Sequence, residues 1–131
     1  MGVFSKGSNM ISETNITVIS SNTELKGDLI TEGIIQIEGK CDGKIISKNS
    51  VIVGLGGTVN GEIIAEEIVV NGIVNGKVEA DRVRIGEKGR LKAVVISEIF
   101  AISEGGSFEG EKKFKLKRSE EEYVEANTEL V

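Results

Sequence analysis

The chain has 131 residues, of which 39% are hydrophobic, 28% charged and 4% aromatic, and this length suits one domain with its own core. The absence of histidine excludes imidazole metal sites and mechanisms that need a histidine base. The single cysteine, Cys41, cannot form an internal disulfide. A net charge of −5 without tryptophan argues against nucleic-acid binding. No stretch approaches the ~18 apolar residues of a transmembrane helix and no signal-peptide segment occurs, so we expect a cytoplasmic protein.

Residues 1–15 are rich in Ser, Asn and Gly and lie outside the pattern that follows, which indicates a flexible N-terminal tail. Within this tail Val3, Phe4 and Lys6 form a short apolar and basic cluster. One such cluster binds lipid weakly, whereas many copies along a polymer would bind with useful avidity. The candidate role is membrane contact, and the alternative is an untargeted tail.

A short pattern then recurs: a glycine, an apolar residue two positions on, and a small residue two further on. It starts at Gly27, Gly43, Gly61, Gly76, Ala93 and Gly110, so the repeat length is 15 to 18 residues. Each unit also carries an apolar pair with period two, at Ile35/Ile37, Val51/Val53, Ile68/Val70, Val83/Ile85 and Phe100/Ile102. A further apolar residue precedes each glycine-like position by two, at Leu25, Cys41, Val59, Val74, Leu91 and Phe108.

Period-two alternation, many Ile and Val residues, and Asn-Gly or Gly-Gly punctuation indicate short β-strands. Three strands per repeat, with like residue stacked on like, predict an all-β, parallel β-helix of about six rungs with a triangular cross-section. A rung is one turn of this solenoid, and a column is the set of equivalent residues stacked along it. We expect the β-helix over residues 16–116, with a core on the order of 29 Å long at about 4.8 Å per rung. Cys41 lies in an apolar column, so a buried packing role is favoured over a reactive one.

A β-helix has two open ends, where backbone groups are unpaired and the apolar interior is uncovered. No proline or amphipathic helix precedes Ile16 to cap the first rung, and three of the five aromatic residues collect near the last one. These ends are candidate surfaces on which another copy stacks; the alternative for the aromatic residues is a hydrophobic plug. The candidate residues are Ile19, Leu25 and Leu29 at the first rung and Phe100, Ile102, Phe108 and Phe114 at the last.

Five basic residues follow Gly110, namely Lys112, Lys113, Lys115, Lys117 and Arg118. Phe114 and Leu116 alternate with them, so we expect a final edge strand whose lysines face water, in preference to a nucleic-acid or lipid patch. Residues 119–131 carry five glutamates and no basic residue, and we expect 117–131 to form an acidic, disordered tail.

No motif for catalysis or nucleotide binding is complete. The run from Gly54 to Gly57 begins like a dinucleotide fingerprint, but Val59 takes the place of the third glycine and no helix is expected to follow. No phosphate-binding Gly-Lys-Ser/Thr loop and no calcium-binding repeat occur. We therefore expect neither an enzyme nor a cofactor, metal, nucleotide or nucleic-acid partner.

The repeat is clearest in VNGEIIAEEIVVNGIVNGKVEADRVRIGEKGRL, residues 59–91. Its Gly-x-Ile-x-Ala and Val-x-Val-x-Gly pattern resembles the bactofilin family over roughly residues 14–116, as does the MGVFSK start. The resemblance implies a right-handed β-helix that polymerises end to end without nucleotide into bacterial cytoskeletal filaments. It also implies filaments at the inner face of the cytoplasmic membrane that position cell-wall, cell-shape or polarity machinery.

The resemblance further implies membrane contact through Val3 and Phe4 and a filament contact at Phe108, with Phe100 nearby. Two features depart from the family pattern. Both tails lack proline, whereas the tails of the family are often proline-rich, and Ala93 replaces a repeat glycine, which would tighten or distort its rung.

A self-assembling scaffold is therefore the leading hypothesis, with other copies, the membrane surface, and cell-wall-modifying or polarity proteins as partners. An acyltransferase of the left-handed β-helix type would need hexapeptide repeats and a catalytic histidine. A small β-helical regulatory module that caps a partner without polymerising is the main alternative. Copies that stack end to end would meet either head to head, through like ends, or head to tail, through unlike ends.

Overall fold

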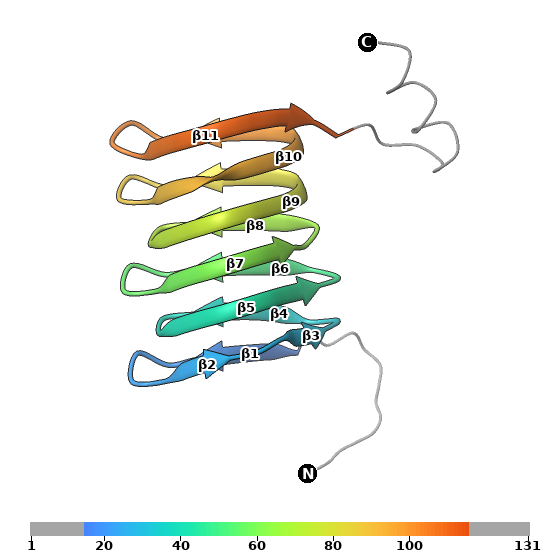
Figure 1. The fold of residues 1–131 in the computed structure, drawn as a ribbon, viewed down its shortest axis with the longest axis vertical. Helices are drawn as coiled ribbons and strands as arrows, with labels where there is room; N and C mark the ends of the chain where they lie inside the picture. The colour runs from blue at the N-terminus through green and yellow to red at the C-terminus, as the bar shows by residue number, and fades with distance from the viewer. Residues whose placement is uncertain (1–14, 116–131) are drawn as a thin grey trace, which may run out of the picture.

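A computed structural model describes residues 15–115, and all regular secondary structure in that range is β-strand (Figure 1). Every strand pairing is parallel, and the strands stack as a solenoid, which confirms the predicted fold class. The strands are β1 (Ile16–Ile19), β2 (Glu24–Lys26), β3 (Leu29–Thr31), β4 (Ile34–Ile37), β5 (Lys40–Ser47), β6 (Ser50–Val53), β7 (Thr58–Ile64), β8 (Glu67–Val70), β9 (Ile73–Ile85), β10 (Arg90–Ile102) and β11 (Ser107–Phe114).

Each complete rung has three segments, divided among one to three strands. β2, β3 and β4 form one rung, β5 and β6 the next, and β9 and β10 each pass through all three segments of their own rungs. In Figure 1 the near strands rise from left to right as the chain ascends from its N-terminus, which is the right-handed sense of winding. The last rung is incomplete within the described residues, because β11 covers only its first two segments.

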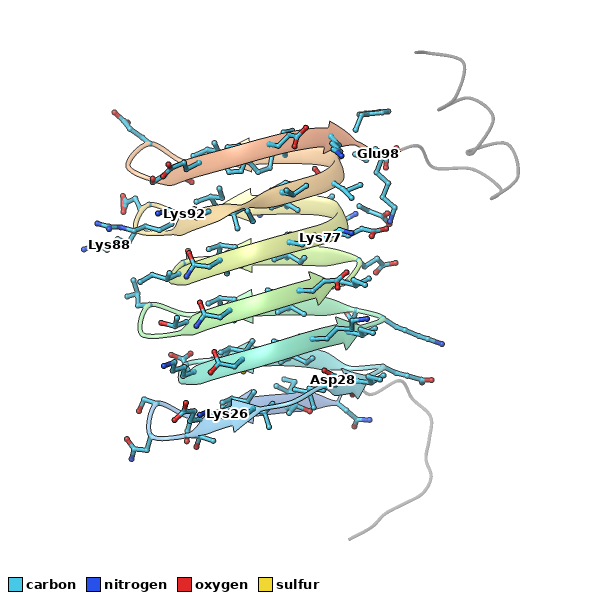
Figure 2. All side chains as sticks on the ribbon, viewed as in Figure 1. Lys26, Asp28, Lys77, Lys88, Lys92 and Glu98 are labelled. Atoms are coloured by element: carbon cyan, nitrogen blue, oxygen red, sulfur yellow. The ribbon has the colours of Figure 1, made fainter. Side chains whose placement is uncertain are left out.

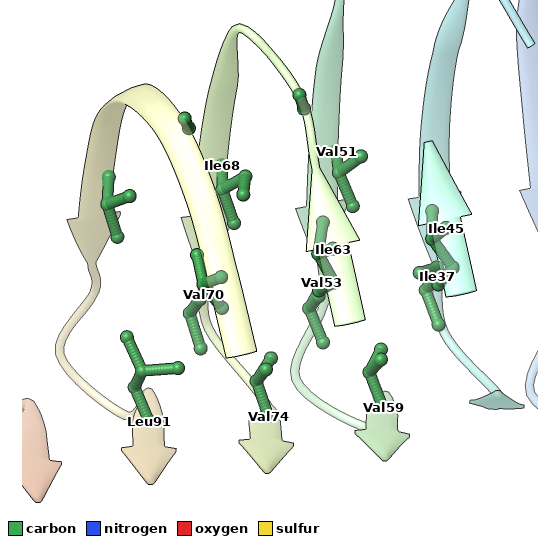
Figure 3. Packing of buried hydrophobic residues seen from close by; sticks show 14 of the residues in the cluster. Ile37, Ile45, Val51, Val53, Val59, Ile63, Ile68, Val70, Val74 and Leu91 are labelled. Carbon is green, nitrogen blue, oxygen red and sulfur yellow. The ribbon is translucent and has the colours of Figure 1, made fainter. Parts of the chain in front are cut away.

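The strand register confirms the predicted columns, since each apolar residue pairs with its equivalent one rung away. One column contains Leu25, Cys41, Val59, Val74, Leu91 and Phe108, and another contains Leu29, Ile45, Ile63, Val78 and Val95. Figure 3 shows members of these columns, among them Val59, Val74 and Ile63, directed into one interior. Most residues of the two columns are fully buried. Each buried Ile or Val stabilises the fold by roughly 1.5–3 kcal/mol before chain entropy is subtracted.

The glycine column explains how neighbouring rungs approach so closely at one corner. Gly61 has a φ of +143°, and a Cβ there would collide with the carbonyl oxygen of Gly43 one rung below. Glycine is the residue that tolerates both conditions. Ala93 occupies the same column yet keeps its register with Gly76 and Gly110, so any distortion of that rung does not extend to its strand pairing.

The predicted tails lie outside the described residues. Val3, Phe4 and Lys6, and the acidic segment 117–131, fall in this category, so the predictions made for them, and the domain boundaries drawn around them, stay predictions.

Candidate functional site

Both ends of the solenoid present open strand edges. At the N-terminal end β1, β2 and β3 each pair with a strand on one side only. At the C-terminal end β11 pairs only with β10, and the Ile99–Ile102 part of β10 pairs only with β9. Within residues 15–115, these edges leave rows of unpaired backbone N–H and C=O groups that can template another strand.

The N-terminal end face consists of three core-column residues and three outward apolar residues of β1, β2 and β3. Ile19 is buried, and Leu25 and Leu29 pack half-buried against the core. The outward residues are strongly exposed, with Ile16 at 57%, Val18 at 56% and Ile30 at 70%. The three predicted residues of this end therefore lie together, and the outward three widen the apolar surface.

The C-terminal end face consists of Phe100, Ile102, Phe108, Lys112 and Phe114. Phe100 and Phe108 pack edge to face, with ring centroids 5.0 Å apart and an interplanar angle of 69°, an arrangement that aromatic pairs favour. Ile102 is 45% exposed and Phe114 is 62% exposed. The structure thus places all four predicted residues of this end in its last strands, β10 and β11.

Phe114 departs from its column. The other members of that corner column are small, and Ser97 directly below Phe114 is fully buried. A phenylalanine ring is too large for a corner built for Ser, Thr or Ala, which explains why the Phe114 side chain lies largely in solvent.

The prediction that the lysines of β11 face water is wrong for Lys112. The register pairs Lys112 with Val95, so it stands in a core column. Its Nζ donates hydrogen bonds of 3.0 Å to the carbonyl oxygens of Ser97 and Lys113, and it lies 6.0 and 5.8 Å from the ring centroids of Phe100 and Phe114. Lys112 lies four positions after Phe108 and two before Phe114, so the alternation of side chains along a strand puts all three on the same face. This spacing was the signal in the sequence that could have placed Lys112 in a core column.

Lys113 and Lys115, the other lysines of that stretch up to residue 115, differ from Lys112. Lys113 is exposed, as predicted. Lys115 forms an ion pair of 3.2 Å with Asp81, which belongs to β9 two rungs below. This ion pair and the Lys112 hydrogen bonds tie the last strand to the body of the solenoid.

The sides of the solenoid are polar, in contrast to its ends. Figure 2 shows charged side chains such as Lys77, Lys88 and Lys92 projecting outward between the ends. An amide ladder runs up one side, where Asn60 donates to Asp42 at 3.0 Å and Asn75 donates to Asn60 at 2.9 Å. Within residues 15–115 eight large hydrophobic residues are exposed, and six of them belong to β1, β3, β10 or β11: Ile16, Val18, Ile30, Ile99, Ile102 and Phe114.

Sequence reasoning missed the outward members of this set, namely Ile16, Val18, Ile30 and Ile99. Their signal was available, because each alternates with an inward residue and stands at a position where a polar residue is expected. The pattern was overlooked because β-branched residues are common on both faces of strands.

Cys41 is 1% exposed, as its column predicts. Burial raises the pKa of its thiol, and the neighbouring Asp42 carboxylate raises it further. A neutral, enclosed thiol suits a packing role. Among residues 15–115, no group of three His, Cys, Asp or Glu side chains is placed to hold a metal ion, and no helix is long and apolar enough to cross a membrane.

The family model described as "Bactofilin: Polymer-forming cytoskeletal" matches residues 17–113, which is well over half of the chain. The chain belongs to the bactofilin family. A curated relative, Bactofilin BacO of Myxococcus xanthus (strain DK1622), is 28% identical over 102 residues, which cover 77% of this chain and 81% of the relative. No solved structure was found to match the chain. The bactofilin family is a polymer-forming, cytoskeletal family rather than an enzyme family.

Proposed function

We propose that this bactofilin polymerises end to end through its N-terminal and C-terminal end faces, without nucleotide, to form a scaffold filament. The observation that carries the proposal is the concentration of exposed apolar side chains on the end rungs of a solenoid with polar sides. Large apolar groups at open strand edges are surfaces that proteins normally cover.

The favourable free energy of assembly comes from two sources at each contact between copies. Burying an exposed Ile or Phe contributes roughly 1.5–3 kcal/mol per side chain, and strand edges that meet can pair their backbone groups. Loss of translational and rotational freedom opposes association, so several apolar side chains must be buried together. The end faces supply such sets, whereas isolated apolar residues on the sides do not.

We further propose that the filaments bind the inner face of the cytoplasmic membrane through Val3, Phe4 and Lys6. Support comes from the apolar and basic character of that cluster and from the avidity that a polymer confers on a weak anchor. A membrane-bound filament of this kind would position cell-shape, cell-wall or polarity proteins. The alternative, a β-helical module that caps a partner, predicts small oligomers at high concentration.

The C-terminal contact can be tested with two isoleucines of similar exposure. Ile102 is 45% exposed on the C-terminal end face, and Ile73 is 41% exposed at the start of β9 within the solenoid. We expect Ile102→Lys to raise the critical concentration for pelleting at least about tenfold, and Ile73→Lys to change it less than about twofold. Equal effects of the two substitutions would refute the C-terminal end face as a contact.

The N-terminal contact has a similar matched pair. Ile30 is 70% exposed in the first rung, and Leu55 is 68% exposed in the turn between β6 and β7. Ile30→Lys should raise the critical concentration, and Leu55→Lys should leave it nearly unchanged. If Leu55→Lys blocks assembly and Ile30→Lys does not, assembly proceeds through the sides of the solenoid. Adding ATP or GTP should change neither wild-type assembly nor that of the variants.

Membrane binding is tested by flotation with vesicles of phosphatidylethanolamine and phosphatidylglycerol. The full-length double variant Val3→Ser/Phe4→Ser should lose flotation while it still forms filaments by electron microscopy. Undiminished flotation of this variant would exclude the N-terminal cluster as the anchor.

A further inference from the structure

The C-terminal end face contains a cation in a position that every other rung fills with an apolar or small residue. Among residues 15–115, Lys112 is the one charged residue that the register places in a core column, above Leu29, Ile45, Ile63, Val78 and Val95. Its ammonium group makes two hydrogen bonds, both to backbone carbonyl oxygens. One N–H of that group therefore has no acceptor among the described residues.

A second polar group at the same corner is also unsatisfied. The Oγ of Ser97 is buried and has no hydrogen-bond partner among residues 15–115, and the carbonyl of the same residue accepts the hydrogen bond from Lys112. Buried polar groups normally have partners. The C-terminal end face thus combines exposed aromatic rings with a cation, and it suits an occupant that carries carboxylates beside apolar side chains.

The chain itself continues from this corner. Lys115, the last described residue, directly follows β11, and the sequence runs on for residues 116–131. Residues 119–131 contain the apolar pair Tyr123 and Val124 among carboxylates at positions 120, 121, 122, 125 and 129. This composition complements the C-terminal end face in charge and in apolar character.

The geometry permits the segment to return over the end face. Residue 122 lies seven positions after Lys115, and an extended chain of that length spans about 23–25 Å. The eight residues of β11 cover about 26 Å at 3.3 Å each. The two carboxylates of β11, Glu109 and Glu111, alternate with the inward Phe108 and Lys112 and lie in outward columns. Glu109 also pairs with Lys92 at 3.9 Å.

We propose that residues 119–131 fold back over the C-terminal end face and cap it. The glutamates lie beside Lys112 and Lys113, and Tyr123 and Val124 cover Phe108 and Phe114. The cap competes with a second copy for the same surface, so it limits assembly at that end. Its effect on assembly rests on the proposed end-to-end polymerisation, whereas the docking itself does not.

The test uses the fact that Tyr123 is the only tyrosine in a chain without tryptophan. Intrinsic tyrosine fluorescence of the full-length protein therefore reports on this segment alone. In submicromolar protein we expect acrylamide quenching of Tyr123 to be at least about threefold weaker than that of N-acetyltyrosinamide. Lys112→Gln should restore strong quenching, and the control Lys77→Gln, at an exposed lysine on the side of the solenoid, should not.

The effect on assembly is measured separately with Glu120→Gln/Glu121→Gln/Glu122→Gln. This triple variant should show strong Tyr123 quenching and a critical concentration about tenfold below that of the wild type. Tyr123 that is as accessible as the free amide in the wild type would overturn the cap. Protection that appears only at concentrations where filaments form would also overturn it, because a second copy would then cover the residue. Protected Tyr123 in the wild type, together with a triple variant that forms no filaments at any concentration, would uphold the cap and refute the proposed polymerisation.

Discussion

Replacing Phe108 by arginine tests the assembly surface most sharply at a single position. Phe108 stacks above Leu91 in its column and packs half-buried against the core and the Phe100 ring. A guanidinium at this position would have to be enclosed when a second copy covers the end. An uncompensated buried charge costs about 3–5 kcal/mol, and each 1.4 kcal/mol changes an equilibrium constant tenfold. We therefore expect Phe108→Arg to raise the critical concentration by a factor of roughly a hundred to a few thousand.

The substitution should leave the solenoid folded, because Phe108 lies in the last rung and the fully buried Ile and Val columns lie below it. Phe108→Leu is the matched control, since leucine fills the same column one rung below at Leu91. Pelleting across a concentration series gives the critical concentration, and circular dichroism reports the fold. Filaments of Phe108→Arg that form at the wild-type concentration would refute the reasoning and remove Phe108 from the contact.

Three further predictions concern stability and are measured by denaturant unfolding in the Phe108→Arg background, where unfolding is separated from depolymerisation. Ile63→Ala should lower the free energy of unfolding by roughly 2–5 kcal/mol, because the removed atoms are fully buried; a loss below about 1 kcal/mol would contradict the packed core. Ser97→Ala should raise it by roughly 1 kcal/mol by removing an unsatisfied hydroxyl, while Ser47→Ala, whose hydroxyl donates to a backbone carbonyl at 2.6 Å, should lower it by a similar amount. Burial and the adjacent carboxylate raise the pKa of the Cys41 thiol above its ordinary 9.0, so the folded chain holds this proton more tightly than the unfolded chain. The free energy of unfolding should therefore fall as pH rises past about 9, relative to Cys41→Val, and parallel pH curves for the two proteins would show that the thiol contributes nothing.

Most of the fold follows from the sequence because a solenoid repeats one local solution. The column of Leu25, Cys41 and Val59 was visible from spacing alone, and the structure pairs those residues in that order. The glycine column was equally visible from spacing, and at Gly61 an added Cβ would collide with the carbonyl oxygen of the rung below. Repetition gave each position several independent observations.

The end rungs were predicted less completely because repetition stops there. Lys112 was predicted to face solvent because it is charged. Its spacing of four positions from Phe108 along the strand places it in a core column instead. An inward lysine is stable only where backbone carbonyl groups accept its hydrogen bonds and no further rung covers it. Neither condition can be seen in the spacing of residues along the sequence. The exposed Ile16 and Ile99 were missed although they stand at outward positions where a polar residue is expected, because β-branched residues are common on both faces of strands.

The most direct test of end-to-end assembly is negative-stain electron microscopy of the purified full-length chain at micromolar concentration, without nucleotide or metal. We predict long, thin, unbranched filaments. Discrete small particles under all salt conditions would contradict end-to-end assembly and favour a β-helical module that caps a partner.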